Sequence, residues 1–438
     1  MVFALSAMSA GVLSFDLARA SAQSRPQSAV AVSASESAGL DAAALYEEAA
    51  GYTRRKVAEA QKNSMPFDQR KLAEEARDLA LRHATALAAR GPAKGLDLYH
   101  LGLLYHLAEK QEAALGSLRR FLTENTDLTP AVAQNAHMVL LHNAVRLGLL
   151  EEAEKWLASY ARVEPAKPGE RYRVEYALAS AYFQKGKFEQ AAPHARESFK
   201  AARAFFEKAS NKQQRDEALL RPAMLLADSL TKAGKRDDSV ATLHELRRLA
   251  LALPSAGLYD SALRALHRHG EIFSAESAAF NQTEPGVLAP ELTVDSWLDQ
   301  PPVTLNGLRG RVVLLDFWAT WCRPCVFTIP KLNTLHKKYK ERGLVVLGLT
   351  RFEGAAEGRE MTQAEELAFL QQFKKKFGSP YGYAVAESTD NSLNYGVASL
   401  PTAVLIDRRG RVRHFVVGVY PGSDRELTSM VEKLLGEP

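Results

Sequence analysis

Cysteine is nearly absent from this sequence. Its 438 residues include two, Cys322 and Cys325, which are three positions apart. Two thiols cannot build a disulfide framework, so we expect the folds to be held by hydrophobic burial. Two thiolates also fall short of the four ligands of a closed structural zinc site, and His336 is the nearest downstream histidine. The sequence therefore predicts no metal and no other cofactor, and leaves the thiol pair as the chemistry to explain.

Strong charge and long apolar runs are also lacking. The net charge of +5 is modest for this length, and it gives no argument for binding nucleic acid or a membrane surface. The longest basic run, 374–376, is interpreted as a solvated helix face. Beyond the N-terminus, no stretch has 18 uninterrupted apolar residues, so we expect no membrane span.

The N-terminus has the pattern of a secretory signal. Residues 2–15 are apolar and small, and Ala20-Ser21-Ala22 fits a cleavage site. We interpret residues 1–22 as a signal peptide and expect a periplasmic or secreted protein. No Lys or Arg precedes Arg19, which departs from the pattern and would be explained by a start codon assigned too late. The alternative is a cytoplasmic protein with a disordered tail. Residues 23–40 are Ser- and Ala-rich and are predicted to be a disordered linker.

Residues 41–282 have a helical texture. They are rich in Ala, Leu, Glu and Arg, and their apolar residues recur at i, i+3, i+4 and i+7. This period predicts a stack of amphipathic helices. The segment carries no recognisable catalytic group, since its histidines occur singly. A stack of this kind presents a groove, so we expect it to bind a partner or a scaffold.

A weak repeat within this region resembles the tetratricopeptide pattern. The matching positions are Leu98, Leu101, Gly102, Tyr105, Ala114 and Leu118; Leu140, Gly148, Ala153, Leu157 and Pro165; Leu178, Tyr182, Gly186 and Ala191; and Leu226, Gly234, Leu243 and Pro254. The glycines are placed where a helix ends most easily. Successive turn glycines are 38 and 48 residues apart (186 − 148 and 234 − 186), so the repeats are degenerate. A plain helical bundle is the alternative.

Residues 283–438 have an α/β texture. Short apolar runs at 311–317 and 344–349 predict buried strands. The segments 402–407 and 412–417 predict a hairpin. We expect helices at 330–342, 362–377 and 424–435. The whole chain is therefore predicted to be multidomain, with an all-α N-terminal region and a C-terminal domain of thioredoxin-like element order.

Cys322 and Cys325 follow an expected strand and open an expected helix, so both side chains share one turn. At this spacing they can form a disulfide with little movement of the backbone. The helix N-terminus and Arg323 favour a thiolate on Cys322, the more exposed thiol, and so lower its pKa. Cys322 would then attack a partner disulfide, and Cys325 would resolve the mixed disulfide. Pro324 suits the first turn, where no amide donor is needed.

Further segments resemble one known family. "VVLLDFWATWCRPC" and "VASLPTAVLIDRRGRV", with "LAPELTV" before them, look like the thioredoxin superfamily. The nearer match is to the TlpA/ResA-like thiol–disulfide oxidoreductases of the bacterial periplasm, over about residues 285–436. The resemblance implies that Leu400–Pro401 is a cis-proline loop, which faces the cysteines and pairs with the backbone of the partner.

We assign catalysis to Cys322, Cys325, Asp316 and Pro401. Contact with the partner protein is assigned to Trp321, Leu400, Arg323 and Pro324, although core packing is the alternative for Trp321.

One assignment departs from the ResA-like pattern. Many members carry a Glu three residues after the second cysteine, where this chain has Thr328. Asp316 instead matches the buried acid of thioredoxin proper. Burial of an Asp side chain costs free energy of folding, so a buried Asp is expected to have a role. The expected role of Asp316 is to take the proton of Cys325. A structural, hydrogen-bonded Asp is the alternative.

The leading hypothesis is a thiol–disulfide oxidoreductase of unknown direction, which acts on protein thiols and is recycled by an external thiol donor or acceptor. A second hypothesis is a docking or assembly protein with a non-catalytic thioredoxin-like domain. The intact cysteine pair, Asp316 and Pro401 speak against it. A third, a thiol peroxidase, would need a Thr-x-x-Cys nucleophile that this motif does not provide.

Overall fold

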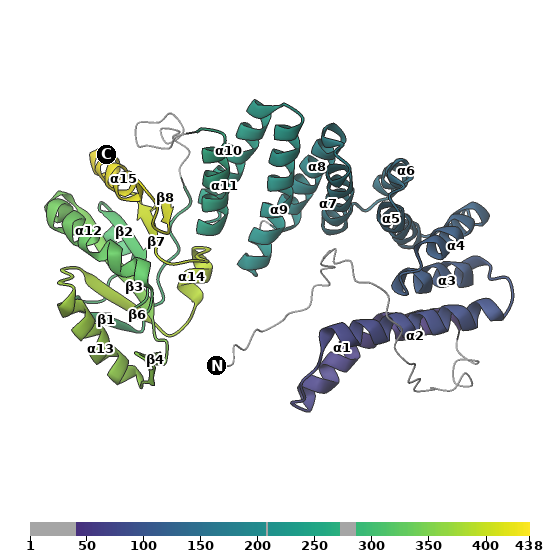
Figure 1. The fold of residues 1–438 in the computed structure, drawn as a ribbon, viewed down its shortest axis with the longest axis horizontal. Helices are drawn as coiled ribbons and strands as arrows, with labels where there is room; N and C mark the ends of the chain where they lie inside the picture. Colours follow the sequence, from purple (N-terminus) through teal and green to yellow (C-terminus); the bar gives the residue numbers. More distant parts are fainter. Residues whose placement is uncertain (1–40, 207–208, 272–285) are drawn as a thin grey trace, which may run out of the picture.

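The computed structural model describes residues 41–206, 209–271 and 286–438. The predicted signal peptide (1–22), the linker (23–40) and the boundary near residue 283 lie outside these ranges. Figure 1 shows the helices following one another along a curved array, with an α/β unit packed at its far end. The all-α region and the mixed-sheet domain are both as predicted from the sequence.

The array consists of consecutive helices joined by short turns. They are α1 (Ala42–Lys62), α2 (Gln69–Ala89), α3 (Gly95–Leu107), α4 (Gln111–Glu124), α5 (Pro130–Arg146), α6 (Leu150–Ala161), α7 (Pro168–Gln184), α8 (Phe188–Phe206), α9 (Lys212–Lys232), α10 (Arg236–Ala252) and α11 (Ala256–Arg268).

The turns between paired helices reuse one backbone conformation. Gly148, Gly186 and Gly234 end α5, α7 and α9 with φ of 72°, 72° and 76°. This is the left-handed region, which glycine enters without steric cost, so each helix ends where the sequence pattern placed its turn. The turn between α3 and α4 uses Glu109, with φ of 55°, in the same role.

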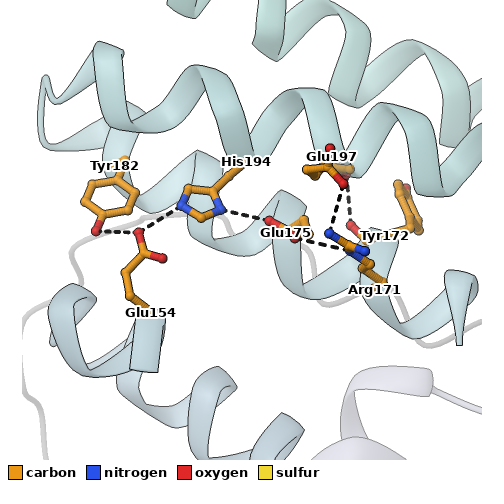
Figure 2. A network of polar contacts seen from close by, with 8 residues as sticks. Glu154, Arg171, Tyr172, Glu175, Tyr182, His194 and Glu197 are labelled. Atoms are coloured by element: carbon orange, nitrogen blue, oxygen red, sulfur yellow. Dashed lines mark hydrogen bonds and ion pairs between the residues drawn. The ribbon is translucent and has the colours of Figure 1, made fainter. Parts of the chain in front are cut away.

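A polar network ties three consecutive helices of the array together (Figure 2). His194 on α8 bonds Glu154 of α6 through Nε2 and Glu175 of α7 through Nδ1, both at 2.8 Å. Glu175 also contacts Arg171, which in turn donates to Glu197 at 2.9 Å. The imidazole therefore links α6 to the α7–α8 pair.

The α/β unit is built on a six-stranded mixed sheet with the order β1-β6-β3-β2-β7-β8. Its strands are β1 (Ser296–Leu298), β2 (Val312–Phe317), β3 (Leu344–Arg351), β6 (Gly382–Ala386), β7 (Thr402–Ile406) and β8 (Val412–Val417). The β2, β3 and β6 strands run parallel, and the other pairs are antiparallel. A small separate hairpin joins β4 (Ala355–Ala356) to β5 (Arg359–Glu360).

The helices of this unit are α12 (Arg323–Tyr339), α13 (Gln363–Lys376), α14 (Asp390–Asn394) and α15 (Ser423–Gly436). Side chains alternate along each strand, so the sheet has two apolar faces. One face, with Leu314 and Val346, packs against α12 and α15. The other, with Val313 and Leu315, packs in a cluster that includes α9, α10 and α11 of the helical array.

Helix α11 therefore covers a sheet face in the way that a helix of the α/β unit itself would. Tyr259 of α11 is fully buried, and its hydroxyl lies 2.6 Å from His414 Nδ1 on β8. His414 Nε2 lies 2.8 Å from Glu426 Oε1 on α15. Because these bonds cross from the array through the sheet to its last helix, the two regions share one core.

Candidate active site

The segment from Trp318 to Cys325 connects the end of β2 to the start of α12. Every residue of β2 is buried, as its apolar run predicts. The α12 helix takes Cys322 as its N-cap and has Pro324 in its first turn. Proline costs no hydrogen bond there, because first-turn amides lack an acceptor within their own helix. The local sequence thus fixes both cysteines at the start of a helix.

Cys322 and Cys325 form a disulfide, and their Cα atoms are 5.3 Å apart. The exposed fraction is 4% for Cys322 and 1% for Cys325. A thiolate must reach a sulfur along the S–S axis to break the bond. Cys322 has the slightly larger exposed fraction, so it is the outer residue of the pair and Cys325 is the more enclosed one.

Backbone amides at the start of α12 converge on Cys322. The amide nitrogen of Cys325 lies 3.2 Å from Cys322 Sγ, and it also donates to the Cys322 carbonyl at 2.9 Å. When the disulfide is reduced, this amide and the helix dipole stabilise negative charge on the outer sulfur. Arg323 follows Cys322 in the sequence, and its guanidinium carbon lies 6.0 Å from the centre of the Phe327 ring.

Asp316 lies on β2, two residues before Trp318, and is 3% exposed. Its neighbours on the same face, Leu314 and Trp318, belong to the apolar cluster that contains both cysteines. Strand alternation therefore directs Asp316 toward that cluster. Burial raises the pKa of Asp316 to about 7. A carboxyl group that titrates near neutral pH can accept a proton and return it.

Aromatic side chains enclose Asp316. Its partner in β3 is Gly348, where a Cβ atom would lie 2.8 Å from Tyr383 Cδ1 and 3.0 Å from Trp318 Nε1. The Trp318 and Tyr383 rings are 4.9 Å apart. Burial raises the pKa of Tyr381 and that of Tyr383, and the charge of Asp316 contributes in the same direction. Burial among these rings disfavours the charged form of the carboxyl group, which accounts for its raised pKa.

The Leu400–Pro401 peptide bond is cis, the isomer that the resemblance implied. Thr402 pairs with Phe317 across β7 and β2, so Pro401 lies beside Trp318 at the sheet end that carries the disulfide. The Pro401 carbonyl accepts a 2.7 Å hydrogen bond from Gly418 N. The strand register thus brings this loop and the cysteine segment to the same end of the sheet.

Large apolar side chains are exposed around this end of the sheet. Trp321 is 66% exposed and Phe327 67%, and Val419, next to Gly418, is 53% exposed. Soluble proteins seldom leave such side chains clustered in water unless they contact another molecule. The exposure of Trp321 argues against core packing as its role.

Thr328 does not supply the acid–base group that its position would carry in many ResA-like proteins. Its hydroxyl donates to the carbonyl oxygen of Cys325 at 2.7 Å, a bond local to the helix. Asp316 is therefore the carboxyl group that the structure places on the cysteine side of the sheet.

Within 41–206, 209–271 and 286–438, no three His, Cys, Asp or Glu side chains gather as a metal site requires. In the same ranges no helix has the length and apolar content to cross a bilayer.

Sequence reasoning missed several neighbours of the disulfide. The exposure of Phe327 could have been predicted, because a residue two positions after the buried Cys325 lies on a different face of the helix. The positions of Tyr381 and Tyr383 could not have been predicted. The short strand β6 has no alternation of apolar and polar residues, and its place beside β3 is set by the tertiary fold.

The comparisons with known proteins agree with this geometry. A family model described as Redoxin matches residues 284–434. Thiol-disulfide oxidoreductase ResA of Bacillus cereus is 33% identical over 133 residues, which are 30% of this chain and 69% of that protein. Protein DipZ of Mycobacterium bovis is 32% identical over 179 residues, 38% of this chain and 24% of that protein.

Among solved structures, a thiol-disulfide isomerase from Corynebacterium glutamicum is 27% identical. The match covers 34% of this chain and 98% of that one, with a TM-score of 0.29. The identity to ResA, over more than two thirds of that relative, shows the family. The chain belongs to the ResA-like thiol–disulfide oxidoreductases of the thioredoxin superfamily.

Proposed function

We propose that this enzyme exchanges its Cys322–Cys325 disulfide with thiols and disulfides of partner proteins in the cell envelope. The observation that carries the proposal is a disulfide at a helix N-terminus with a buried carboxyl group, Asp316, on the same face of the sheet. The predicted signal at residues 1–22 supports the location.

In the reducing direction, the Cys322 thiolate attacks one sulfur of a partner disulfide. That bond breaks, and the departing partner sulfur leaves as a thiolate and takes a proton from water. Asp316 accepts the proton of Cys325, whose thiolate attacks Cys322 Sγ and releases the second partner thiolate. The partner gains two electrons and the enzyme loses two. The oxidising direction is the same sequence reversed.

The loop at Leu400–Pro401 receives the backbone of the partner in this proposal, and Trp321, Arg323 and Pro324 contact its side chains. The exposed apolar surface at Trp321 and the position of the loop beside Trp318 support these roles. Because the sequence has no third cysteine, an external thiol donor or acceptor must restore the pair.

The helical region holds the partner or a scaffold in the same proposal. A hollow of about 180 Å³ between α5, α6, α7 and α8 supports this role. The buried Gln134, one of its lining residues, has an Oε1 atom without a hydrogen-bond partner. Lys167, Arg171, Glu197 and Lys200 also line it, and Glu197 pairs with Arg171 at 2.9 Å and with Lys200 at 3.8 Å, so the hollow suits a segment with free peptide amides.

A trapping experiment tests the exchange reaction. Reduced Cys325→Ser protein, mixed with a peptide that contains one disulfide, should accumulate a mixed disulfide detectable by mass, because the resolving thiol is missing. Cys322→Ser protein should accumulate far less, because its remaining sulfur is enclosed. If neither variant forms the adduct while both stay folded, the docking-protein hypothesis replaces this one.

A further inference from the structure

We propose that the helical region positions the cis-proline loop of the redox site. The start of α11, supported by α9, holds residues 394–397, which lead directly into Leu400–Pro401. The inference rests on the proposed exchange with partner proteins, because it concerns the loop that receives the partner. In this proposal the helical array both binds the partner and positions a loop of the redox site.

Two backbone amides of α11 donate to carbonyl groups of this segment. The Ala256 amide donates to Tyr395 O at 2.9 Å, and the Gly257 amide donates to Gly396 O at 3.0 Å. First-turn amides have no acceptor inside their own helix, so they are free to bind an outside chain. The two bonds fix both the position and the orientation of consecutive peptide groups in the loop.

Side chains from α9 reinforce this contact. Lys212 Nζ donates to Asn394 Oδ1 at 2.6 Å. Ser255, which is fully buried, donates through Oγ to Asp216 Oδ2 at 2.6 Å, and Arg215 Nε donates to Asp216 Oδ1 at 2.8 Å. The start of α11 is thus anchored on α9, and the loop segment is anchored on both helices.

The approach at Gly396 is too close for a side chain. Its φ is +56°, and a Cβ atom would lie 2.8 Å from both Cα and Oγ of Ser255 and 3.1 Å from Asp216 Oδ2. Backbone atoms at that distance cannot move away cheaply. Any substitution must therefore push the loop away from α11.

The displacement would reach the redox site through buried contacts. Tyr395 is fully buried, and its ring lies 5.6 Å from that of Phe317, the residue that pairs with Thr402 next to Pro401. Leu400 packs against the apolar clusters on both faces of the sheet. The segment between the α11 contact and Pro401 is four residues long, so little slack separates them.

Turnover of insulin disulfides by the full-length protein tests this inference. In Gly396→Ala we expect KM to rise by roughly tenfold or more, since a small misplacement of a positioning group can cost up to about 10²-fold. Reduction of 2-hydroxyethyl disulfide, which has no peptide backbone to pair with the loop, should stay within a factor of about two. The pH profile of Cys322 alkylation should not change, because α12 is untouched.

Gly378→Ala is the matched control. Gly378 has nearly the same φ, +58°, but no atom lies within 4 Å of its added Cβ, so it carries the backbone strain without the contact. Lys212→Met is a second variant, which removes one bond to the loop from a partly exposed position and should raise KM several-fold in a folded protein.

The outcomes separate the two proposals. Equal KM values for Gly396→Ala and Gly378→Ala, or a wild-type KM for Lys212→Met, would overturn the positioning role while leaving the exchange reaction intact. If the wild-type protein neither reduced insulin disulfides nor oxidised the thiols of reduced insulin, the exchange reaction would be overturned, and the positioning role with it.

Discussion

At the scale of single residues, Asp316 combines a cost to stability with a use in catalysis. Its carboxyl group is buried among aromatic rings, and burial raises its pKa to about 7. An ionised carboxylate in such a place destabilises the fold, but a group that titrates near neutral pH is suited to take the proton of Cys325. Stability and reactivity should therefore respond in opposite directions when this residue is changed.

Asp316→Asn should stabilise the protein at pH 8. Because the pKa of Asp316 in the folded protein lies above the ordinary aspartate value of 3.8, the free-energy cost of the carboxylate grows as pH rises from about 4 to about 7 and is constant above that. We expect a gain of roughly 2–4 kcal/mol in the free energy of unfolding at pH 8, and almost none at pH 4. Urea unfolding at both pH values measures it, and the resolving step should slow in the same variant.

Asp407→Asn is the control for this prediction. Asp407 is also buried, but its carboxylate accepts hydrogen bonds from the amides of Arg409 and Arg411 and from the Arg413 side chain. Its replacement should destabilise the protein at pH 8. If both variants lost stability, Asp316 would be a hydrogen-bonded structural residue and not a proton acceptor.

At the scale of elements, apolar runs were sufficient to predict the positions of β2, β3, β7 and β8, because fully buried strands need apolar residues on both faces. The cysteine motif was predicted to open a helix, and the apolar pattern predicted a helix from Pro330. The two are one helix, α12, which begins at Arg323 and continues through that proline. Proline removes one hydrogen bond from a helix interior, and packing of Leu332 and Leu335 in the cluster against the sheet outweighs that loss.

Several short elements escaped prediction. The three-residue strand β1 and the five-residue helix α14 are too short for a period to appear. The strands β4 and β5 of the small hairpin have two residues each and are shorter still. Of the site, the cysteines, Asp316 and the cis-proline could be found from the sequence, but the exposed Phe327 and the contact at Gly396 depend on the tertiary fold.

Close packing between α3 and α4 predicts an unusual glycine effect. Alanine normally stabilises a helix relative to glycine by about 0.8–1.0 kcal/mol. At Gly102, however, a Cβ atom would lie 2.6 Å from Leu118 Cγ, so Gly102→Ala should destabilise by about 1–3 kcal/mol. Gly116→Ala, in the exposed part of α4 with nothing within 4 Å, should stabilise. Thermal unfolding of the two variants should shift in opposite directions, and a rise in Tm for both would contradict the packing argument.

The network at His194 makes the helical array sensitive to pH. Burial lowers the pKa of His194, but its hydrogen bonds to Glu175 and Glu154 outweigh this, so the pKa is raised overall. The stabilisation is fully present below the unfolded pKa of about 6.5 and is lost as pH rises through the folded pKa.

We expect the Tm difference between the wild type and His194→Gln to shrink by about 2–4 °C between pH 6 and pH 9. Circular dichroism of the helical signal measures it. A difference that is independent of pH would show that His194 contributes through packing alone.

At the scale of the whole molecule, the two regions are joined by a common core. Residues far apart in the sequence, such as Tyr259 and His414, meet across the sheet face. The sequence showed where the texture changes from α to α/β, but not that α11 would cover Val313, Leu315 and Val404. A helix that covers a separate sheet has the same amphipathic pattern as one that continues a helical stack.

This arrangement predicts that residues 286–438 alone are not a stable unit. Removal of the array would expose the sheet face lined by Val313, Leu315 and Leu347 to water. The isolated segment should bind ANS strongly or aggregate, whereas the full-length protein should not. A soluble, cooperatively unfolding segment with weak ANS binding would show that the array is dispensable for folding.

The most direct test of the redox function is an equilibrium titration of the Cys322–Cys325 pair in the full-length protein, with dithiothreitol or glutathione buffers and mass-tagging of free thiols. The proposed mechanism predicts a reversible two-electron transition. A midpoint near about −270 mV would indicate a reductase, and one near about −120 mV an oxidant. A pair that does not titrate reversibly at any buffer composition would contradict a function in thiol–disulfide exchange.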